Sequence, residues 1–433
     1  MRTIRPTATL AAALALTLAG CAGGNDGDTA DAGAAPASTQ TQEPMTEPAE
    51  EAPAAVMPMG TGDPFADTRT AAQHMPETAA TLAGGFASAL EIPGATDSAA
   101  AGLRAELTAL LQEHVYLAGI AVATAYTTAP DSEEFAAAAA TLDANSVALS
   151  EAVTSLAGEE RGTAFLGLWR EHIGYFVDYA VATKGGDTAG QEEALASLEA
   201  YTVEAGAFFE EVSGGELPAG DVAESLRMHV STLSTAIDDL AAGSPEAYAS
   251  LQAAAGHVVE GAGVIATGLS AAGGLEGDPN DDAAVLRAQL TAALQEHVYL
   301  AGISVFTAYT TEGGTGSEAF QAAAATLDGN SVALSEAVGT LAGAEQGTAF
   351  LDLWREHIGY FVDYAEAAAG DDDAAATAAL TELDGYRGEA GAFFAEISAG
   401  ELPADAVAEG LAMHVQTLAG AIDSLDQALV EAG

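Results

Sequence analysis

The sequence predicts an all-α fold made of two tandem homologous helical bundles, each with about six helices. One phrase, WREHIGYFVDY, stands at residues 169–179 and again, unchanged, at residues 354–364. Within it and around it, apolar residues recur at steps of three and four, which places them on one face of a helix. The chain is rich in alanine, a strong helix former. It has no sustained alternation of Val, Ile and Thr with polar residues, so strands are not expected.

The first twenty residues predict a lipoprotein signal peptide. Arg2 and Arg5 precede a short apolar run over residues 8–18, which is typical of secretory signals and too short to span a membrane. The run ends in Leu-Ala-Gly followed by Cys21, and this ending resembles the lipobox of bacterial lipoproteins. The resemblance implies that Cys21 is lipidated and anchors the mature protein to the outer face of the cytoplasmic membrane, in a bacterial cell envelope. The alternative is an ordinary secretory signal that contains a stray cysteine.

Cys21 is the only cysteine in the chain. Once it carries lipid, the folded part has no thiol. Disulfides, thiolate zinc sites and cysteine nucleophiles are therefore excluded.

Residues 21–63 predict a disordered linker. They are mainly Ala, Gly, Pro, Thr, Gln, Asp and Glu, with almost no large apolar side chain. Such a composition does not bury enough surface to offset the entropy of ordering. The segment is expected to tether the bundles to the membrane.

The remaining residues form a sequence repeat, with the first copy at 64–243 and the second at 244–433. Helices are expected near 66–90, 99–127, 132–157, 162–183, 189–213 and 219–242, and at the matching places in the second copy. The boundary is placed at Gly243-Ser244-Pro245, where a helix-ending glycine is followed by residues that start helices. A repeat of this length is domain-sized, which distinguishes duplication from a solenoid.

The charge of the chain excludes several partners. It carries 64 Asp and Glu against 11 Lys and Arg, for a net charge of −53. Nucleic acids and anionic lipid headgroups both require a basic surface, so neither is an expected ligand. An acidic surface of this kind is typical of proteins suited to high salt. It also concentrates cations near the protein.

Three histidines in each copy lie in the middle of apolar helical stripes. In the first copy these are His114, His172 and His229, and Asn145 holds a similar place on a fourth helix. The second copy matches them with His297, His357, His414 and Asn330. Mid-helix positions of packed antiparallel helices come to a similar level, so each bundle is expected to contain a polar layer in its core.

A fourth histidine per copy lies on the first helix of the repeat. His74 is followed three residues later by Glu77, and His257 by Glu260 in the same way. Residues three apart share a helical face. Because the eight histidines of the chain all fall at matching positions, these two pairs are included among the candidate ligands of their own copies.

A polar layer in an apolar core must be satisfied, because buried polar groups without partners are costly. One solution is a metal ion held by neutral imidazoles, with Glu77 and Glu260 near it and with Asn145, Tyr175, Asn330 and Tyr360 supporting the ligands. Imidazole suits Cu, Zn and Fe. The other solution is a ligand-free core in which the imidazoles bond to Asn145, Tyr175, Tyr179 and the backbone.

Three functional hypotheses follow. The first is a lipid-anchored, extracytoplasmic protein that handles or senses a transition metal, with one His-rich site per bundle and no catalysis. The second is a structural or protein-interaction module of the cell envelope with a ligand-free polar core. The third is a metallo-oxidoreductase. Against it, the chain lacks the Glu-x-x-His pairs of di-iron proteins. Haem held by two core histidines is a lesser alternative, and no nucleotide-binding or serine-hydrolase motif is present.

Three segments of each copy also resemble a group of uncharacterised helical proteins of bacterial cell envelopes. In the first copy they are Glu113-His114-Val115, the phrase at 169–179 and Met228-His229-Val230. The resemblance covers both copies and implies a cell-envelope location, but it carries no known activity.

Overall fold

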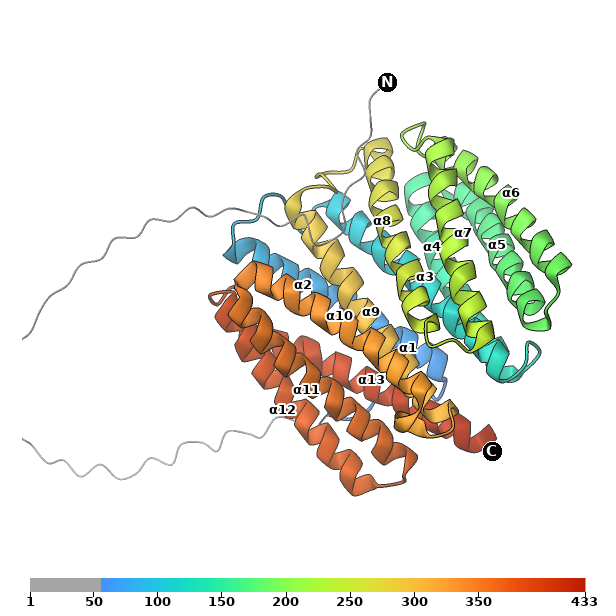
Figure 1. Ribbon diagram of the computed structural model, residues 1–433. Helices are drawn as coiled ribbons and strands as arrows, with labels where there is room; N and C mark the ends of the chain where they lie inside the picture. The colour runs from blue at the N-terminus through green and yellow to red at the C-terminus, as the bar shows by residue number, and fades with distance from the viewer. Residues whose placement is uncertain (1–55, 433) are drawn as a thin grey trace, which may run out of the picture. The chain divides into compact units, whose positions relative to one another are not determined.

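The computed structural model describes residues 56–432, with side chains up to residue 430. The predicted signal peptide, the lipidation site Cys21 and most of the predicted linker lie outside the described residues. All regular structure from residue 56 to residue 432 is helical, which confirms the all-α fold class (Figure 1). The helices are α1 (Pro64–Gln73), α2 (Met75–Ala89), α3 (Ala99–Thr127), α4 (Glu133–Ala157), α5 (Glu159–Gly185), α6 (Thr188–Val212), α7 (Ala219–Ala242), α8 (Ala247–Gly273), α9 (Asp282–Thr310), α10 (Glu318–Ala342), α11 (Ala344–Ala369), α12 (Asp373–Ile397) and α13 (Ala404–Ala432), with one 3₁₀ turn, η1 (Gly314–Gly316).

The helix ends follow from short polar caps and glycines. Ser98 and Ser132 begin α3 and α4, each accepting a hydrogen bond from a backbone N–H of the first turn. Gly243 ends α7 with φ 66°, a left-handed conformation that glycine adopts without a steric penalty. The helix-ending role predicted for Gly243 is therefore confirmed, and α8 starts only a few residues later.

The first predicted helix of the sequence repeat differs between the copies. In the second copy it is the continuous α8, whereas in the first copy it divides into α1 and α2 at His74. Pro76 stands in the first turn of α2, and proline cannot supply the backbone N–H that a continuous helix needs at that point. The corresponding residue of α8 is Val259, which imposes no break.

The helix contacts group the chain differently from the sequence repeat. Helix α8 packs on α3 and α7, so one bundle is the continuous stretch α3–α8. Helices α1 and α2 pack on α9 and α13 and take the same place in the other bundle, beside α9–α13 (Figure 1). The boundary predicted at residues 243–244 therefore marks the repeat in sequence, while the contacts change bundle after α8. The short α7–α8 connection accounts for this, because it turns α8 back along α7.

The last residues of the predicted linker are packed against the fold. Val56 is 4% exposed, and the N–H of Met59 donates to the carbonyl of Gln416 on α13 at 2.8 Å. A Cβ on Gly420 would overlap the backbone of Met59, so glycine is required at this crossing. Residues 56–63, which the sequence assigns to the linker, are thus part of the packed structure.

Helices α3 and α9 contact each other where the two bundles meet, and we call this contact the seam. Tyr116 of α3 stacks on Tyr299 of α9, with ring centroids 5.2 Å apart and planes 12° apart. Each tyrosine also donates to a glutamate of the opposite helix. Tyr299 Oη bonds Glu113 Oε2 at 3.1 Å, and Tyr116 Oη bonds Glu296 Oε2 at 3.0 Å.

The two glutamates of the seam accept further hydrogen bonds, but the donors differ in charge. Glu113 is 1% exposed and accepts from Arg69 Nε at 2.7 Å and from Asn145 Nδ2 at 3.0 Å. Glu296 accepts from Gln252 and from Asn330 through the corresponding bonds. Arg69 therefore neutralises one carboxylate, whereas the other has only neutral donors around it.

Helix α3 is also long and apolar enough to span a membrane, judged by length and composition. However, 72% of its most apolar window is buried inside the bundle. The burial explains its composition without a membrane, since a central helix needs an apolar surface on several sides.

The seam generates a prediction about stability. Tyr299→Phe removes one hydrogen bond to the buried Glu113 carboxylate, and bonds to charged groups contribute about 1.5–3 kcal/mol. We expect the free energy of unfolding, measured by urea titration, to fall by that amount. Tyr175→Phe is the matched control, because Tyr175 is only partly buried and lies away from the seam. Equal stability of the two variants would contradict a stabilising role for the seam bond.

Candidate metal centres

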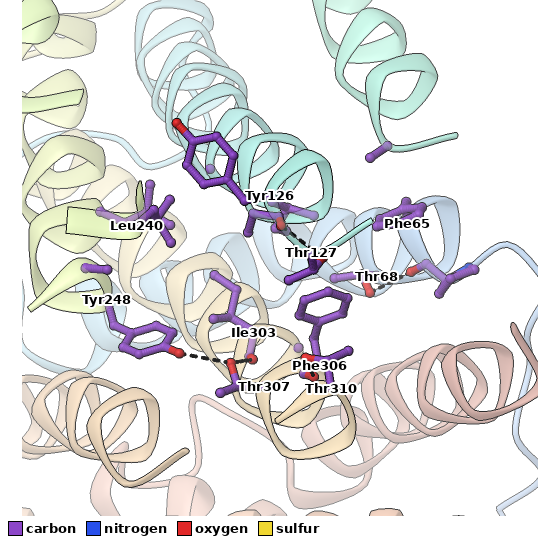
Figure 2. Close-up of a pocket in the computed structure, with 18 of the residues that line it drawn as sticks. Phe65, Thr68, Tyr126, Thr127, Leu240, Tyr248, Ile303, Phe306, Thr307 and Thr310 are labelled. Carbon is purple, nitrogen blue, oxygen red and sulfur yellow. Dashed lines mark hydrogen bonds between the residues drawn. The ribbon is translucent and has the colours of Figure 1, made fainter. Parts of the chain in front are cut away.

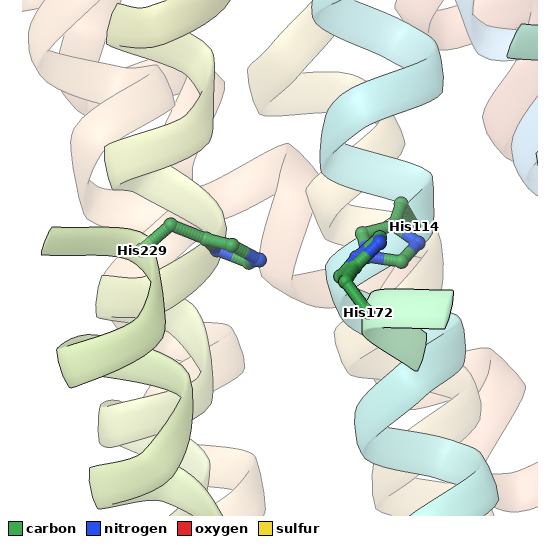
Figure 3. A group of neighbouring side chains, drawn as sticks. All are labelled: His114, His172 and His229. Atoms are coloured by element: carbon green, nitrogen blue, oxygen red, sulfur yellow. The ribbon is translucent and has the colours of Figure 1, made fainter. Parts of the chain in front are cut away.

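The structure brings the three core histidines of each copy together. His114 on α3, His172 on α5 and His229 on α7 form one triad, and His297 on α9, His357 on α11 and His414 on α13 form the other. In each triad the candidate ligand nitrogens all lie within 4.8 Å of one another. Figure 3 shows His229 extending from its own helix toward the pair formed by His114 and His172. The predicted polar layer therefore exists in both bundles.

The shortest separation inside each triad matches the geometry of metal ligands. His114 Nε2 lies 3.3 Å from His172 Nε2, and His297 Nε2 lies 3.3 Å from His357 Nε2. Two nitrogens bound to one tetrahedral ion at about 2.0–2.1 Å are separated by roughly 3.3 Å. Two of the three ligands in each triad thus already stand at a bonding separation, and the third needs only a small approach.

Burial keeps the six imidazoles neutral. None of them is more than 6% exposed. Desolvation by burial, and to a lesser extent nearby His229, lower the pKa of His114 to about 3. Desolvation also lowers the pKa of His229 and of His414 to about 4, and moves the pKa of His172, His297 and His357 well below the usual value. A neutral imidazole has the free lone pair that a metal requires.

Aromatic rings enclose each triad. Around the first, the Trp169 ring stands edge-on to His172 at 4.5 Å and Tyr201 stacks on His172 at 4.7 Å. Phe176 contacts His229 at 5.8 Å between ring centroids. The second triad has Trp354, Tyr386 and Phe361 in the same places. The surroundings are apolar, so they strengthen any charge interaction at the centre and supply few hydrogen bonds.

The 3.3 Å contact between the Nε2 atoms also fits a hydrogen bond between two neutral imidazoles, whereas the bonds that the ligand-free alternative expects from Asn145 and Tyr179 are absent among the described residues. Asn145 donates to the Leu110 carbonyl and to Glu113, while the Tyr179 hydroxyl donates to Asp238. Neither residue reaches an imidazole. Nδ1 of all six histidines is buried without a partner among the described residues, and so are both nitrogens of His414 and Nε1 of Trp169 and Trp354. The nearest nitrogens of each triad are Nε2 atoms, so an ion bound there would pair Nε2 and leave Nδ1 without a partner.

The fourth histidines lie outside the triads. His74 and His257 are half-buried, and Glu77 and Glu260 are exposed. His257 Nε2 lies 3.0 Å from the Ser225 carbonyl. Positive charge on His257 lowers the pKa of His229, and charge on His74 lowers the pKa of His414. Each is therefore near the triad of the other copy, because α8 packs in the first bundle and α1–α2 in the second.

The predicted supporting residues have other roles. Asn145 and Asn330 bind the seam glutamates, as described above, while Tyr175 and Tyr360 are only partly buried. Sequence reasoning overlooked Tyr201 and Tyr386, which provide the rings stacked on His172 and His357. The spacing of apolar residues in the sequence could have identified both tyrosines as core residues. Tyr201 shares a helical stripe with Leu198 and Phe209, and Tyr386 occupies the matching position of the second copy.

Comparison with known proteins gives no relative from which a function can be transferred. No protein-family model, no curated protein and no solved structure matches the chain. The function must therefore be argued from the triads themselves.

The lowered pKa values predict how the metal-free protein responds to acid. The unfolded chain protonates its histidines below their usual pKa of about 6.5, whereas folded His114 and His229 stay neutral until about pH 3 and pH 4. Stability contributed by these groups is thus complete above pH 6.5 and is lost as the pH falls. Below pH 6.5, each such histidine should lower the free energy of unfolding by about 1.4 kcal/mol per pH unit.

Urea unfolding at pH 7.0, 6.0 and 5.0 measures this slope. The variant His172→Leu should flatten it by one histidine's share. An unchanged slope in His172→Leu would show that His172 titrates alike in the folded and unfolded states.

Proposed function

We propose that the protein binds a transition-metal ion in each bundle. The observation that carries the proposal is the convergence of three buried, neutral imidazoles whose nearest Nε2 atoms are 3.3 Å apart, in both triads. The neutral state of the imidazoles supports it, since burial keeps their lone pairs free for a metal. The alternative is a ligand-free structural module in which the two nearest imidazoles hydrogen-bond to each other.

The ligand set favours a monovalent ion. Each triad offers three neutral nitrogens and includes no carboxylate. The cost of transferring an ion into an apolar core rises with the square of its charge, and for a single charge it is already several kcal/mol. Of the expected metals Cu, Zn and Fe, copper has a monovalent form. We therefore propose Cu⁺ as the preferred ion, with Zn²⁺ as the competing one.

The burial of the triads favours storage or sensing over catalysis. Catalytic metal sites keep an open position for water or substrate. Here the imidazoles are 0–6% exposed and aromatic rings surround them. An oxidoreductase acting on a bound substrate would need a path to the ion, so we place this function third.

We further propose that the protein works at the outer face of the cytoplasmic membrane, anchored by lipid on Cys21. The lipobox-like ending of the predicted signal peptide supports this location. A metal-handling protein there would meet ions entering or leaving the cell, and the net charge of −53 would raise the cation concentration around it.

Metal content tests the binding proposal. The purified full chain, loaded anaerobically with Cu⁺ and desalted, should retain two equivalents by inductively coupled plasma mass spectrometry. His172→Leu and His357→Leu should each retain one, and the double variant should retain none. His257→Leu is the matched control and should keep two, because His257 lies outside the triads.

A competition experiment tests the choice of Cu⁺ separately from metal binding itself. With Cu⁺ and Zn²⁺ offered against chelators of known affinity, we expect Cu⁺ to bind at least tenfold more tightly. Preference for Zn²⁺ would overturn the Cu⁺ assignment and leave metal binding intact. No retained metal, or retention that survives both triad substitutions, would overturn the metal proposal itself.

The anchoring proposal has its own test. Expressed in a bacterium, the full chain should fractionate with membranes and its mature N-terminal peptide should carry the mass of a diacylglycerol on Cys21. Cys21→Ala should release it into the soluble extracytoplasmic fraction. An unmodified Cys21 in a soluble wild-type protein would contradict the anchor.

A further inference from the structure

A second cavity lies along the seam, away from both triads. It has a volume of about 180 Å³, and we call it the seam pocket. Helices α1, α3, α8 and α9 provide most of its wall, so both bundles contribute to it. Figure 2 shows Thr127 of α3 above Phe306 of α9, with Tyr248 of α8 on one side and Phe65 of α1 on the other.

The lining of the seam pocket is free of charge. Among residues 56–430, no Asp, Glu, Lys, Arg or His side chain lines it, although the chain carries 64 acidic residues. A cation attracted by the acidic surface would find no counter-charge there, and an anion would find no donor of positive charge. The pocket therefore excludes ions and favours a neutral molecule.

Most hydroxyl groups around the pocket are already bonded to the protein. Thr68, Thr307 and Thr310 each donate to a carbonyl of their own helix at 2.7 Å. Tyr126 Oη donates to the Ala180 carbonyl at 2.8 Å. Tyr248 Oη has only a long contact of 3.3 Å, to Thr307 Oγ1. The Tyr248 hydroxyl is thus able to exchange this long contact for a bond to a ligand.

The space arises from a difference between the two sequence copies. Ala123 on α3 corresponds to Phe306 on α9, and both line the pocket. Beside the pocket, glycines at matching positions of the two copies allow α3 to approach α8 and α9 to approach α1. A Cβ on Gly119 would lie 2.6 Å from Leu251, and one on Gly302 would lie 3.1 Å from Thr68. The helices therefore approach tightly beside the pocket, and the small Ala123 side chain leaves room within it.

We propose that the seam pocket binds one small, neutral, mostly apolar molecule with the bulk of a substituted benzene ring. Burial of apolar surface would supply the affinity, and a hydrogen bond with Tyr248 would orient the molecule. A cavity of about 150 Å³ lined by apolar side chains is enough to take up benzene. Because helices of both bundles line the pocket, the ligand would contact both at once. This site is independent of the proposed metal function.

Binding of indole to the full-length Cys21→Ala chain tests the proposal without detergent. Isothermal titration calorimetry should show one indole per chain, whereas benzoate and benzylammonium, which are charged and of similar bulk, should bind at least tenfold more weakly. Ala123→Phe places in the pocket the residue that the other copy already carries, and should weaken indole binding at least tenfold. Val181→Phe is the matched control, because Val181 is 48% exposed and lies outside the pocket.

A second variant guards against misfolding of the first. Phe306→Ala enlarges the pocket and should increase affinity for naphthalene relative to indole at least threefold. The triad double variant His172→Leu/His357→Leu should bind indole as the wild type does. Equal binding of the charged compounds, unchanged indole binding in a folded Ala123→Phe chain, or an unchanged ligand preference in Phe306→Ala would each overturn the proposal.

Discussion

Three neutral imidazoles meet in the apolar core of each bundle, and the close approach of their ring nitrogens is the constraint on which the rest of the site depends. Buried polar groups are costly unless they have partners. The surrounding aromatic side chains, among them Trp169 and Tyr201, provide packing surfaces to His172 and no hydrogen bond to its Nδ1. The same surroundings lower the histidine pKa values and so keep the lone pairs free. An apolar shell that keeps three converging imidazoles neutral suits an ion that binds their free lone pairs.

The seam relates the two centres to one another through α3 and α9. Each helix carries a triad histidine on one face and, one residue earlier, a glutamate on the face toward the other bundle: Glu113 beside His114, and Glu296 beside His297. The reciprocal tyrosine–glutamate bonds therefore fix the helices that supply one ligand to each triad. Arg69 neutralises only Glu113, so the electrostatic environments of the two triads differ even though their ligand sets match.

Sequence patterns predicted the helices and the convergence of His114, His172 and His229, because a three-and-four spacing fixes which face of a helix is buried. They did not predict that His257 lies near His229 and His74 near His414. That outcome depends on which helices pack together, and periodicity within one helix carries no such information. The position of the seam glutamates also depends on helix packing. Glu113 is adjacent to His114 in the chain, yet it faces the seam, where Arg69 and Tyr299 donate hydrogen bonds to it. Tyr201 was overlooked because a stacked ring leaves the same apolar pattern as ordinary core packing.

The central claim is that the imidazoles of each triad bind one copper ion directly. X-ray absorption spectroscopy at the copper edge, on the Cu⁺-loaded chain, tests it most directly. The account predicts about three nitrogen ligands near 2.0 Å, the outer-shell scattering that imidazole rings produce, and loss of that signal by half in His172→Leu. Oxygen ligands without imidazole scattering, or a spectrum unchanged by His172→Leu and His357→Leu together, would show that the metal binds elsewhere and that the triads are not its site.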